Sequence, residues 1–140
     1  MIHEVVAALV VQAGWILLGQ RSPTRVFYPG VWDMFGGHVE PGEDASRTLV
    51  RELEEELGIT PVEWSFLETL RVPVPAQGDG EPEEMIAHLY LVSAWSGTPA
   101  NRQPEEHDII GWFSLEEALQ LDLAAPLYRK IFVQYVGDNR

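Results

Sequence analysis

The chain has 140 residues, 46% of them hydrophobic and 22% charged, which is the composition of a globular protein that can bury a core. Asp and Glu outnumber Lys and Arg by 22 to 9, and the resulting formal charge of −13 disfavours a nucleic acid polymer as a partner. With no cysteine, the sequence excludes disulfides, thiolate metal sites and a cysteine nucleophile. We expect one domain over residues 1–140.

Two apolar runs open the chain. Val5 to Val11 and Trp15 to Gln20 are rich in β-branched and aromatic residues, and a short glycine-containing connection separates them. This pattern predicts a hairpin of two buried strands. The whole stretch from Val5 to Leu18 is interrupted and shorter than the ~20 residues that a membrane span needs. We therefore expect a cytoplasmic protein with no membrane partner.

The next segment is rich in proline and glycine. Arg21 to Val31 is predicted to be a loop, and Trp32 to Phe35 a short strand. Gly36 to Gly42 is predicted to form a turn ahead of a helix. The helix itself is indicated by apolar residues that repeat every four positions, namely Ala45, Leu49, Leu53 and Leu57.

The ends of this helix also carry signals. Glu43 and Asp44 suit the positive end of the dipole in the first turn, and Gly58 stands where a C-terminal cap belongs. We therefore expect a helix whose first turn holds Glu43 and Asp44 and that ends before Gly58.

The second half of the chain alternates between strands and helices. Strands are predicted at Trp64 to Val74, Met85 to Trp95 and Asp108 to Phe113, and helices begin near Ser114, which opens a capping box, and Pro126. The second of these strands is apolar on both faces, which is typical of a central strand. The order of elements predicts an α/β fold in which a mixed sheet carries helices on its two faces.

Three carboxylates, those of Glu52, Glu55 and Glu56, share one strip of the predicted helix. Glu52 and Glu56 are four residues apart with no basic residue one turn away, a repulsion that costs a few tenths of a kcal/mol and that a divalent cation would reverse. The alternative is a solvated face with ion pairs, since charges of opposite sign follow each other at i, i+4 through Glu43, Arg47, Arg51 and Glu55.

The order of residues around this helix is more specific than the charge spacing. From Gly37 the chain reads glycine, five residues, Glu43, seven residues, Arg51-Glu52-Leu53, one residue, Glu55-Glu56, one residue and Gly58-Ile59. This segment, residues 37–59, resembles the Nudix box at every fixed position. Seven specified residues at ~7% abundance coincide at a given start on the order of once in 10⁸. The flanking elements also look like the α/β/α sandwich of the Nudix hydrolases.

The resemblance implies roles for residues that match the box. It gives Glu52, Glu55, Glu56 and the Gly37 carbonyl as ligands of Mg²⁺, for which Mn²⁺ could substitute. It gives Glu43 and Arg51 as supports of the loop and helix. Glu52 or Glu55 would be the general base. Outside the box, Glu105 or Glu106 resembles an acid that some family members use to position metal or water.

The family hydrolyses nucleoside diphosphates linked to another moiety, and we expect a small-molecule nucleotide substrate. A compact chain favours a nucleoside triphosphate, cleaved to the monophosphate and pyrophosphate; ADP-ribose or another nucleotide sugar is the alternative, suggested by Pro75. Aromatic rings can stack on a nucleobase, and arginines can contact phosphate. We therefore expect a substrate-binding set that comprises Arg21, Arg25, Phe27, Tyr28 and Trp32. Packing and ordinary solubility are the competing interpretations of these residues.

Two other classes of function stay open beside an enzyme. A Nudix-fold module could sense a nucleotide without cleaving it, although an intact box favours catalysis. A calcium-binding interaction domain lacks the D-x-D-x-D-G loop and ranks last. A homodimer is left open as the oligomeric state.

Overall fold

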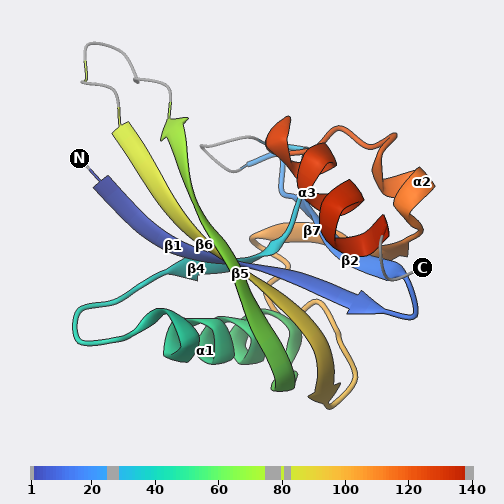
Figure 1. The fold of residues 1–140 in the computed structure, drawn as a ribbon, viewed down its shortest axis with the longest axis horizontal. Helices are drawn as coiled ribbons and strands as arrows, with labels where there is room; N and C mark the ends of the chain where they lie inside the picture. Colours follow the sequence, from blue (N-terminus) through green and yellow to red (C-terminus); the bar gives the residue numbers. More distant parts are fainter. Residues whose placement is uncertain (1, 25–28, 75–79, 81–82, 138–140) are drawn as a thin grey trace.

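The computed structural model describes residues 2–24, 29–74, 80 and 83–137, and within these the chain forms seven strands and three helices (Figure 1). In chain order the elements are β1 (Ile2–Gln12), β2 (Trp15–Arg21), β3 (Trp32–Asp33), β4 (Phe35–His38), α1 (Ala45–Leu57), β5 (Thr60–Val74), β6 (Glu83–Ser96), β7 (His107–Phe113), α2 (Leu115–Ala118) and α3 (Leu127–Val136).

The strands form one mixed sheet. Its main path runs β3-β2-β1-β6-β5, with β4 paired to β1 and β7 paired to β2. Only β1 and β6 run parallel; the other pairs described are antiparallel. The predicted central strand is confirmed, because β6 lies between β1 and β5.

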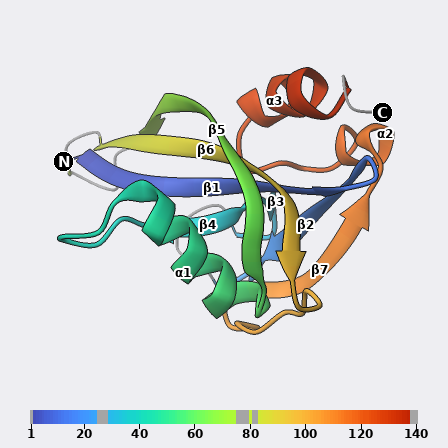
Figure 2. The same ribbon diagram turned by 60° about the horizontal axis from the view of Figure 1, so that its bottom comes forward.

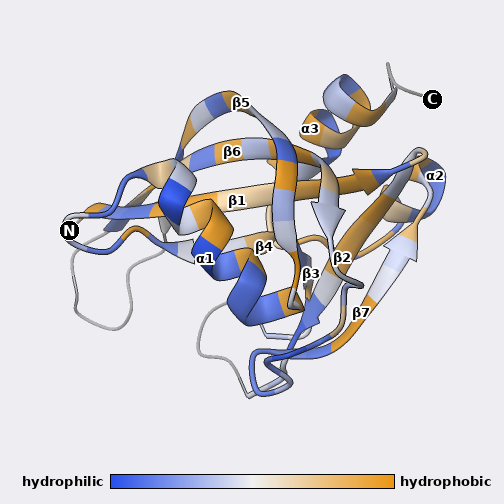
Figure 3. Cartoon of the chain, turned by 90° about the horizontal axis from the view of Figure 1, so that it is seen from below, coloured by the Kyte–Doolittle hydropathy of each residue, from blue (hydrophilic) through white to orange (hydrophobic). Residues whose placement is uncertain are grey.

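Helices cover the sheet on two sides (Figures 1 and 2). Alternate residues of β1 divide between two cores: Val6, Ala8 and Val10 join the core under α1, whereas Leu9 joins the core under α2 and α3. This alternation is the two-residue period of a strand. Figure 3 shows the long hydrophobic stretches on β1 and β2 and the mixed character of α1. The predicted α/β sandwich is therefore confirmed.

Most predicted elements are found close to their predicted bounds. The hairpin turn is confirmed, with Gln12 paired to Trp15, and α1 begins and ends where its apolar repeat predicts. The strands β5, β6 and β7 each begin one to four residues before their predicted starts. Among the described residues, no helix is long and apolar enough to cross a membrane.

The predicted turn over Gly36 to Gly42 is wrong in its first half. Gly36, Gly37 and His38 belong to β4 and pair with β1, and the predicted strand of residues 32–35 is divided between β3 and β4. Gly36 is needed for close packing: a Cβ there would lie 1.9 Å from the carbonyl oxygen of Val6. A glycine pair therefore marks a close approach of two strands as readily as a turn.

Candidate active site

The helix α1 holds the acidic residues of the box in a fixed frame. Asp44 caps its N-terminus by accepting a hydrogen bond from the Arg47 N–H at 2.9 Å. Gly58 ends it in the left-handed conformation at φ 70°, and its N–H donates to the Glu54 carbonyl at 3.0 Å. Leu49, Leu53 and Leu57 are fully buried under the sheet, so the register of the carboxylates against β4 is fixed by core packing.

One guanidinium serves several carboxylates, and we call this group the Arg51 network: Arg51 with Glu43, Glu52 and Glu55. Arg51 donates to both oxygens of Glu43 at 2.7 and 2.9 Å. It also donates to Glu52 at 2.9 Å, to Glu55 at 3.4 Å and to the His38 carbonyl at 3.1 Å. Arg51 thus ties the helix to the end of β4 and to the loop that holds Glu43.

The observed ion pairs differ from the i, i+4 ladder that the sequence predicts. Glu43 binds Arg51, eight positions on, and not Arg47 in an i, i+4 ladder. Arg51 also reaches Glu52, its neighbour in sequence, so the inference that only Glu43 and Glu55 have a cationic partner is wrong. Spacing rules treat the helix as isolated, whereas the long arginine side chain bends across its surface toward β4.

Glu56 lies on the other side of the strip and is 4% exposed. Its carboxylate accepts a hydrogen bond from the Gly36 N–H at 3.0 Å, which joins α1 to β4. Glu52 also packs against this strand: a Cβ on Gly37 would lie 2.3 Å from its carboxylate oxygen. A side chain at Gly36 would therefore collide with the Val6 backbone, and a side chain at Gly37 would displace the Glu52 carboxylate.

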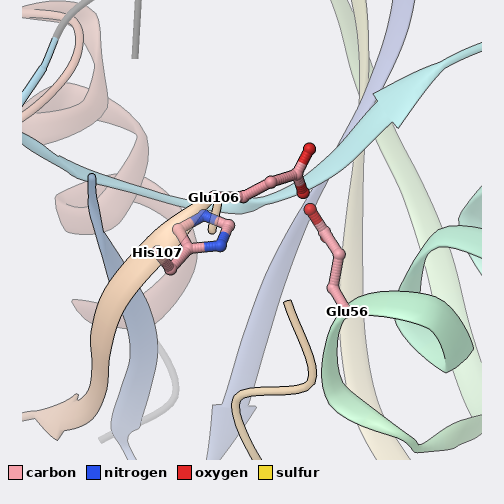
Figure 4. Close-up of side chains that lie close together, drawn as sticks. All are labelled: Glu56, Glu106 and His107. Atoms are coloured by element: carbon pink, nitrogen blue, oxygen red, sulfur yellow. The ribbon is translucent and has the colours of Figure 1, made fainter. Parts of the chain in front are cut away.

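Beside Glu56 stand two residues from a distant part of the chain (Figure 4). Glu56, Glu106 and His107, which we call the Glu56 cluster, each bring one ligand atom within 4.8 Å of the others. Glu106 precedes β7 and His107 begins it. Of the two predicted loop acids, the structure brings Glu106 to the helix, whereas Glu105 is exposed.

The pKa values of Glu43 and Glu56 are shifted in opposite directions. Hydrogen bonds from Arg51 and Thr48 lower the pKa of Glu43 to about 2. Burial, together with the charges of Glu52 and Glu106, raises the pKa of Glu56 well above its usual range. Burial also raises the pKa of Glu52, against the opposing effect of Arg51. Burial and like charges disfavour the ionised form of these carboxylates. A divalent cation would offset that effect, because hard cations prefer oxygen donors.

The predicted substrate-binding residues are placed only in part. Arg25, Phe27 and Tyr28 lie outside the described residues, as does Pro75. Arg21 ends β2 and forms an ion pair with Asp33 at 3.5 Å, a side chain that also accepts a hydrogen bond from the Tyr128 hydroxyl at 2.7 Å.

Trp32 is partly buried against the core beneath α2 and α3. Its ring makes an edge contact with Phe113, with the ring centroids 4.9 Å apart. Its backbone is bonded on both sides to the segment between these helices, through Asp122 and Ala124. These contacts support the packing interpretation of Trp32, which competes with substrate contact.

Sequence analysis assigned no site role to Gly36, Asp33 or His107. Gly36 precedes the box, and its backbone N–H carries no sequence signal. His107 carries no motif signal either, because the four histidines lack the spacing of a helical zinc motif. One signal was available: His107 directly follows the predicted loop acid Glu106, and two adjacent residues at the start of a strand lie at the same end of the sheet.

The sequence model of the NUDIX domain family matches residues 1–135. The chain belongs to this family, and the expected Nudix hydrolase is confirmed. A protein of Burkholderia pseudomallei described as a MutT NUDIX hydrolase has the same fold, with a TM-score of 0.76, 33% identity and coverage of 96% of this chain and 97% of that one. Members of the family generally use a divalent metal ion.

Two groups of relatives are similar along most of their length. A protein of Escherichia coli K12 named CTP pyrophosphohydrolase is 41% identical over 123 residues, covering 86% of this chain and 82% of its own. A protein of Salmonella agona named nucleoside triphosphatase NudI is 36% identical over 131 residues, covering 86% of this chain and 88% of its own.

Proposed function

We propose that this protein is a Mg²⁺-dependent pyrophosphohydrolase that converts a nucleoside triphosphate and water to a nucleoside monophosphate and pyrophosphate. The structural observation that carries the proposal is the buried carboxylate of Glu56, which faces Glu52 and Glu106 beside the glycines of β4. The names of the relatives favour a nucleoside triphosphate over ADP-ribose.

The metal-binding residues in this proposal are Glu52, Glu55, Glu56 and the Gly37 carbonyl, with Glu106 in preference to Glu105. A bound Mg²⁺ withdraws charge from the phosphates and lowers the pKa of bound water. The carboxylates contribute negative charge at fixed positions, because Gly36 holds Glu56 and Arg51 holds Glu52. Mn²⁺ is the expected substitute.

The general base in this proposal is Glu52 or Glu55, and their surroundings differ. The Glu55 side chain is 47% exposed and 3.4 Å from Arg51, so water reaches it freely. The Glu52 side chain is 14% exposed and 2.9 Å from Arg51. A base must reach the attacking water within hydrogen-bonding distance. Glu43 and Arg51 have supporting roles, since Arg51 bridges the helix, the preceding loop and β4.

The opposite end of the substrate would bind the Arg21 to Trp32 segment. Phe27 and Tyr28 are proposed to stack on the base, and Arg25 to contact phosphate. Arg21 is the weaker candidate of the two arginines because it already neutralises Asp33. We propose that residues 1–140 act as a single domain; a cytoplasmic location and a homodimer stay predictions.

A substrate panel tests the proposal. The protein is incubated with Mg²⁺ and each of the common nucleoside triphosphates, ADP-ribose and a diphosphate without a base, and products are identified by mass. We expect monophosphate and pyrophosphate from a triphosphate and the highest kcat/KM for that class. No turnover of any compound would support the nucleotide-sensing alternative, and preference for ADP-ribose would move the protein to the other substrate class.

A further inference from the structure

His107 is held rigidly at the start of β7 and is 4% exposed. Its backbone N–H donates to the Gln103 carbonyl at 3.2 Å, and its own carbonyl accepts from the Asn101 side chain at 2.8 Å. The ring packs on Phe35 with centroids 5.2 Å apart. A Cβ on Gly19 would lie 2.6 Å from the His107 ring, so the glycine leaves room for the imidazole.

This fixed ring faces the two carboxylates of the Glu56 cluster (Figure 4). One ring nitrogen and one oxygen each from Glu56 and Glu106 lie within 4.8 Å of one another. A cation with bonds of ~2.1 Å holds ligand atoms up to ~4.2 Å apart, so small side-chain rotations would bring all three to one ion. Glu56 is anchored by Gly36, and the Glu106 backbone by the Ser22 N–H at 2.9 Å.

An imidazole changes what such a site prefers. Mg²⁺ selects oxygen ligands and keeps its waters, whereas the first-row transition-metal ions, of which Mn²⁺ is the first, accept an imidazole nitrogen more readily. We infer that His107 donates a ring nitrogen to the divalent ion held by Glu56 and Glu106, so that this site has mixed nitrogen and oxygen ligands and binds Mn²⁺ more tightly than Mg²⁺. The inference rests on the proposed function, in which the same carboxylates bind the catalytic metal.

The direct test uses Mn²⁺ alone, without nucleotide, at about pH 8, so that protons compete less with the metal for its ligands. Pulsed electron paramagnetic resonance of the Mn²⁺-loaded protein reports a directly bound ¹⁴N nucleus. We expect this ¹⁴N coupling in the unmodified protein and its loss in His107→Phe. Phenylalanine keeps a ring against Phe35 but has no nitrogen to donate.

Affinities give the second readout. We expect His107→Phe to weaken Mn²⁺ binding about tenfold or more and Mg²⁺ binding by less than about threefold. His107→Gln, which is smaller and polar, should give the same pattern if packing is not the cause. The matched control is His3→Gln, because His3 also pairs with a glutamate, Glu83 at 3.0 Å, but lies outside the cluster. This control should leave both affinities and the ¹⁴N coupling unchanged.

The outcomes separate this inference from the proposed function. If Mn²⁺ binds without ¹⁴N coupling, or if His107→Phe weakens both ions equally, His107 is not a ligand and the inference is overturned. In that case loss of Mn²⁺ binding in Glu56→Gln would leave the proposed metal site standing. If no divalent ion binds the unmodified protein at all, the proposed function and the inference fall together. Melting of each variant in chelator shows whether the fold is intact.

Discussion

The Arg51 network and the Glu56 cluster lie on the same helix but balance their charges differently. In the Arg51 network, one guanidinium lies within hydrogen-bonding distance of Glu43, Glu52 and Glu55. In the Glu56 cluster, a buried carboxylate faces the charges of Glu52 and Glu106, and the Gly36 N–H is the partner that favours its ionised form. Arg51 therefore offsets the negative charge of the carboxylates around it, whereas a bound cation would relieve the repulsion that ionised Glu56 meets.

The largest effect is expected from Glu56→Gln. The amide can still accept the Gly36 hydrogen bond, but the ligand charge is lost, so kcat should fall by about 10² to 10⁴. Thermal stability in chelator should hold or rise, because a buried and repelled charge is removed. Steady-state kinetics measure the change in kcat, and thermal melting in chelator measures the change in stability. A large loss of stability without metal would contradict the comparison.

Glu52→Gln and Glu55→Gln should lower kcat by a similar 10² to 10⁴ if each is a base or ligand. Repulsion along the helix alone predicts that either change leaves stability unchanged or higher. The Glu52 side chain is 14% exposed and contacts Arg51, but burial still raises its pKa, so the ionised form stays disfavoured in the folded protein. We therefore expect Glu52→Gln to leave the melting temperature in chelator unchanged or to raise it, and Glu55→Gln, at 47% exposure, to leave it unchanged. Turnover at the unmodified rate would remove that residue from the catalytic set.

Glu106 and Glu105 offer a matched pair next to each other. Glu106→Gln should lower kcat/KM about tenfold to a hundredfold, the range for loss of a partner at a metal site. Glu105→Gln should change it by less than about twofold, because Glu105 is exposed and outside the cluster. Equal effects from the two variants would mean that overall negative charge, and not position, is what matters.

Arg51→Met tests the other region. Loss of the guanidinium removes charged hydrogen bonds to Glu43 and Glu52 and leaves two partly buried carboxylates without it, so unfolding free energy should fall by about 1 to 3 kcal/mol. Arg47→Met is the control, because the Arg47 side chain is exposed; its effect should stay within about 0.5 kcal/mol. Urea denaturation in chelator measures both, and equal losses would show that Arg51 is no more than a surface charge.

The two groups also differ in how far the sequence predicts them. The box predicted that Glu43 and Arg51 support each other, and the apolar period from Ala45 to Leu57 predicted the extent of α1, although Asp44 is its N-cap and not part of its first turn. The contact of Arg51 with Glu52 was not predictable from i, i+4 spacing, since it depends on how the side chain bends toward β4. Bringing Glu106 and His107 to Glu56 requires β7 to pair with β2, a contact between residues about 90 positions apart that no local pattern encodes.

The glycines illustrate the same limit. Gly58 was predictable as a helix cap because the local sequence defines its position. Gly36 was interpreted as part of a turn, but it is in a strand because the Val6 carbonyl approaches it. Local rules for glycine identify a special backbone and cannot tell a turn from a close contact between strands that meet only in the folded chain.

The smallest expected effect is a difference in pH dependence, measured as melting temperature in chelator between about pH 3 and 8. The folded pKa of Glu43, about 2, is below its ordinary value of 4.5, so its contribution to stability is present above pH 4.5 and is lost as pH falls toward 2. The folded pKa of Glu56 is raised, so its contribution is present below the ordinary value and is lost as pH rises through the raised pKa.

Glu43→Gln should therefore flatten the acidic side of the profile, and Glu56→Gln the neutral side. Saturating Mg²⁺ should flatten the neutral side of the unmodified protein as well, because the cation favours the ionised carboxylate. If both variants flatten the same side, the pKa values of Glu43 and Glu56 are not shifted in opposite directions, and the comparison between them fails.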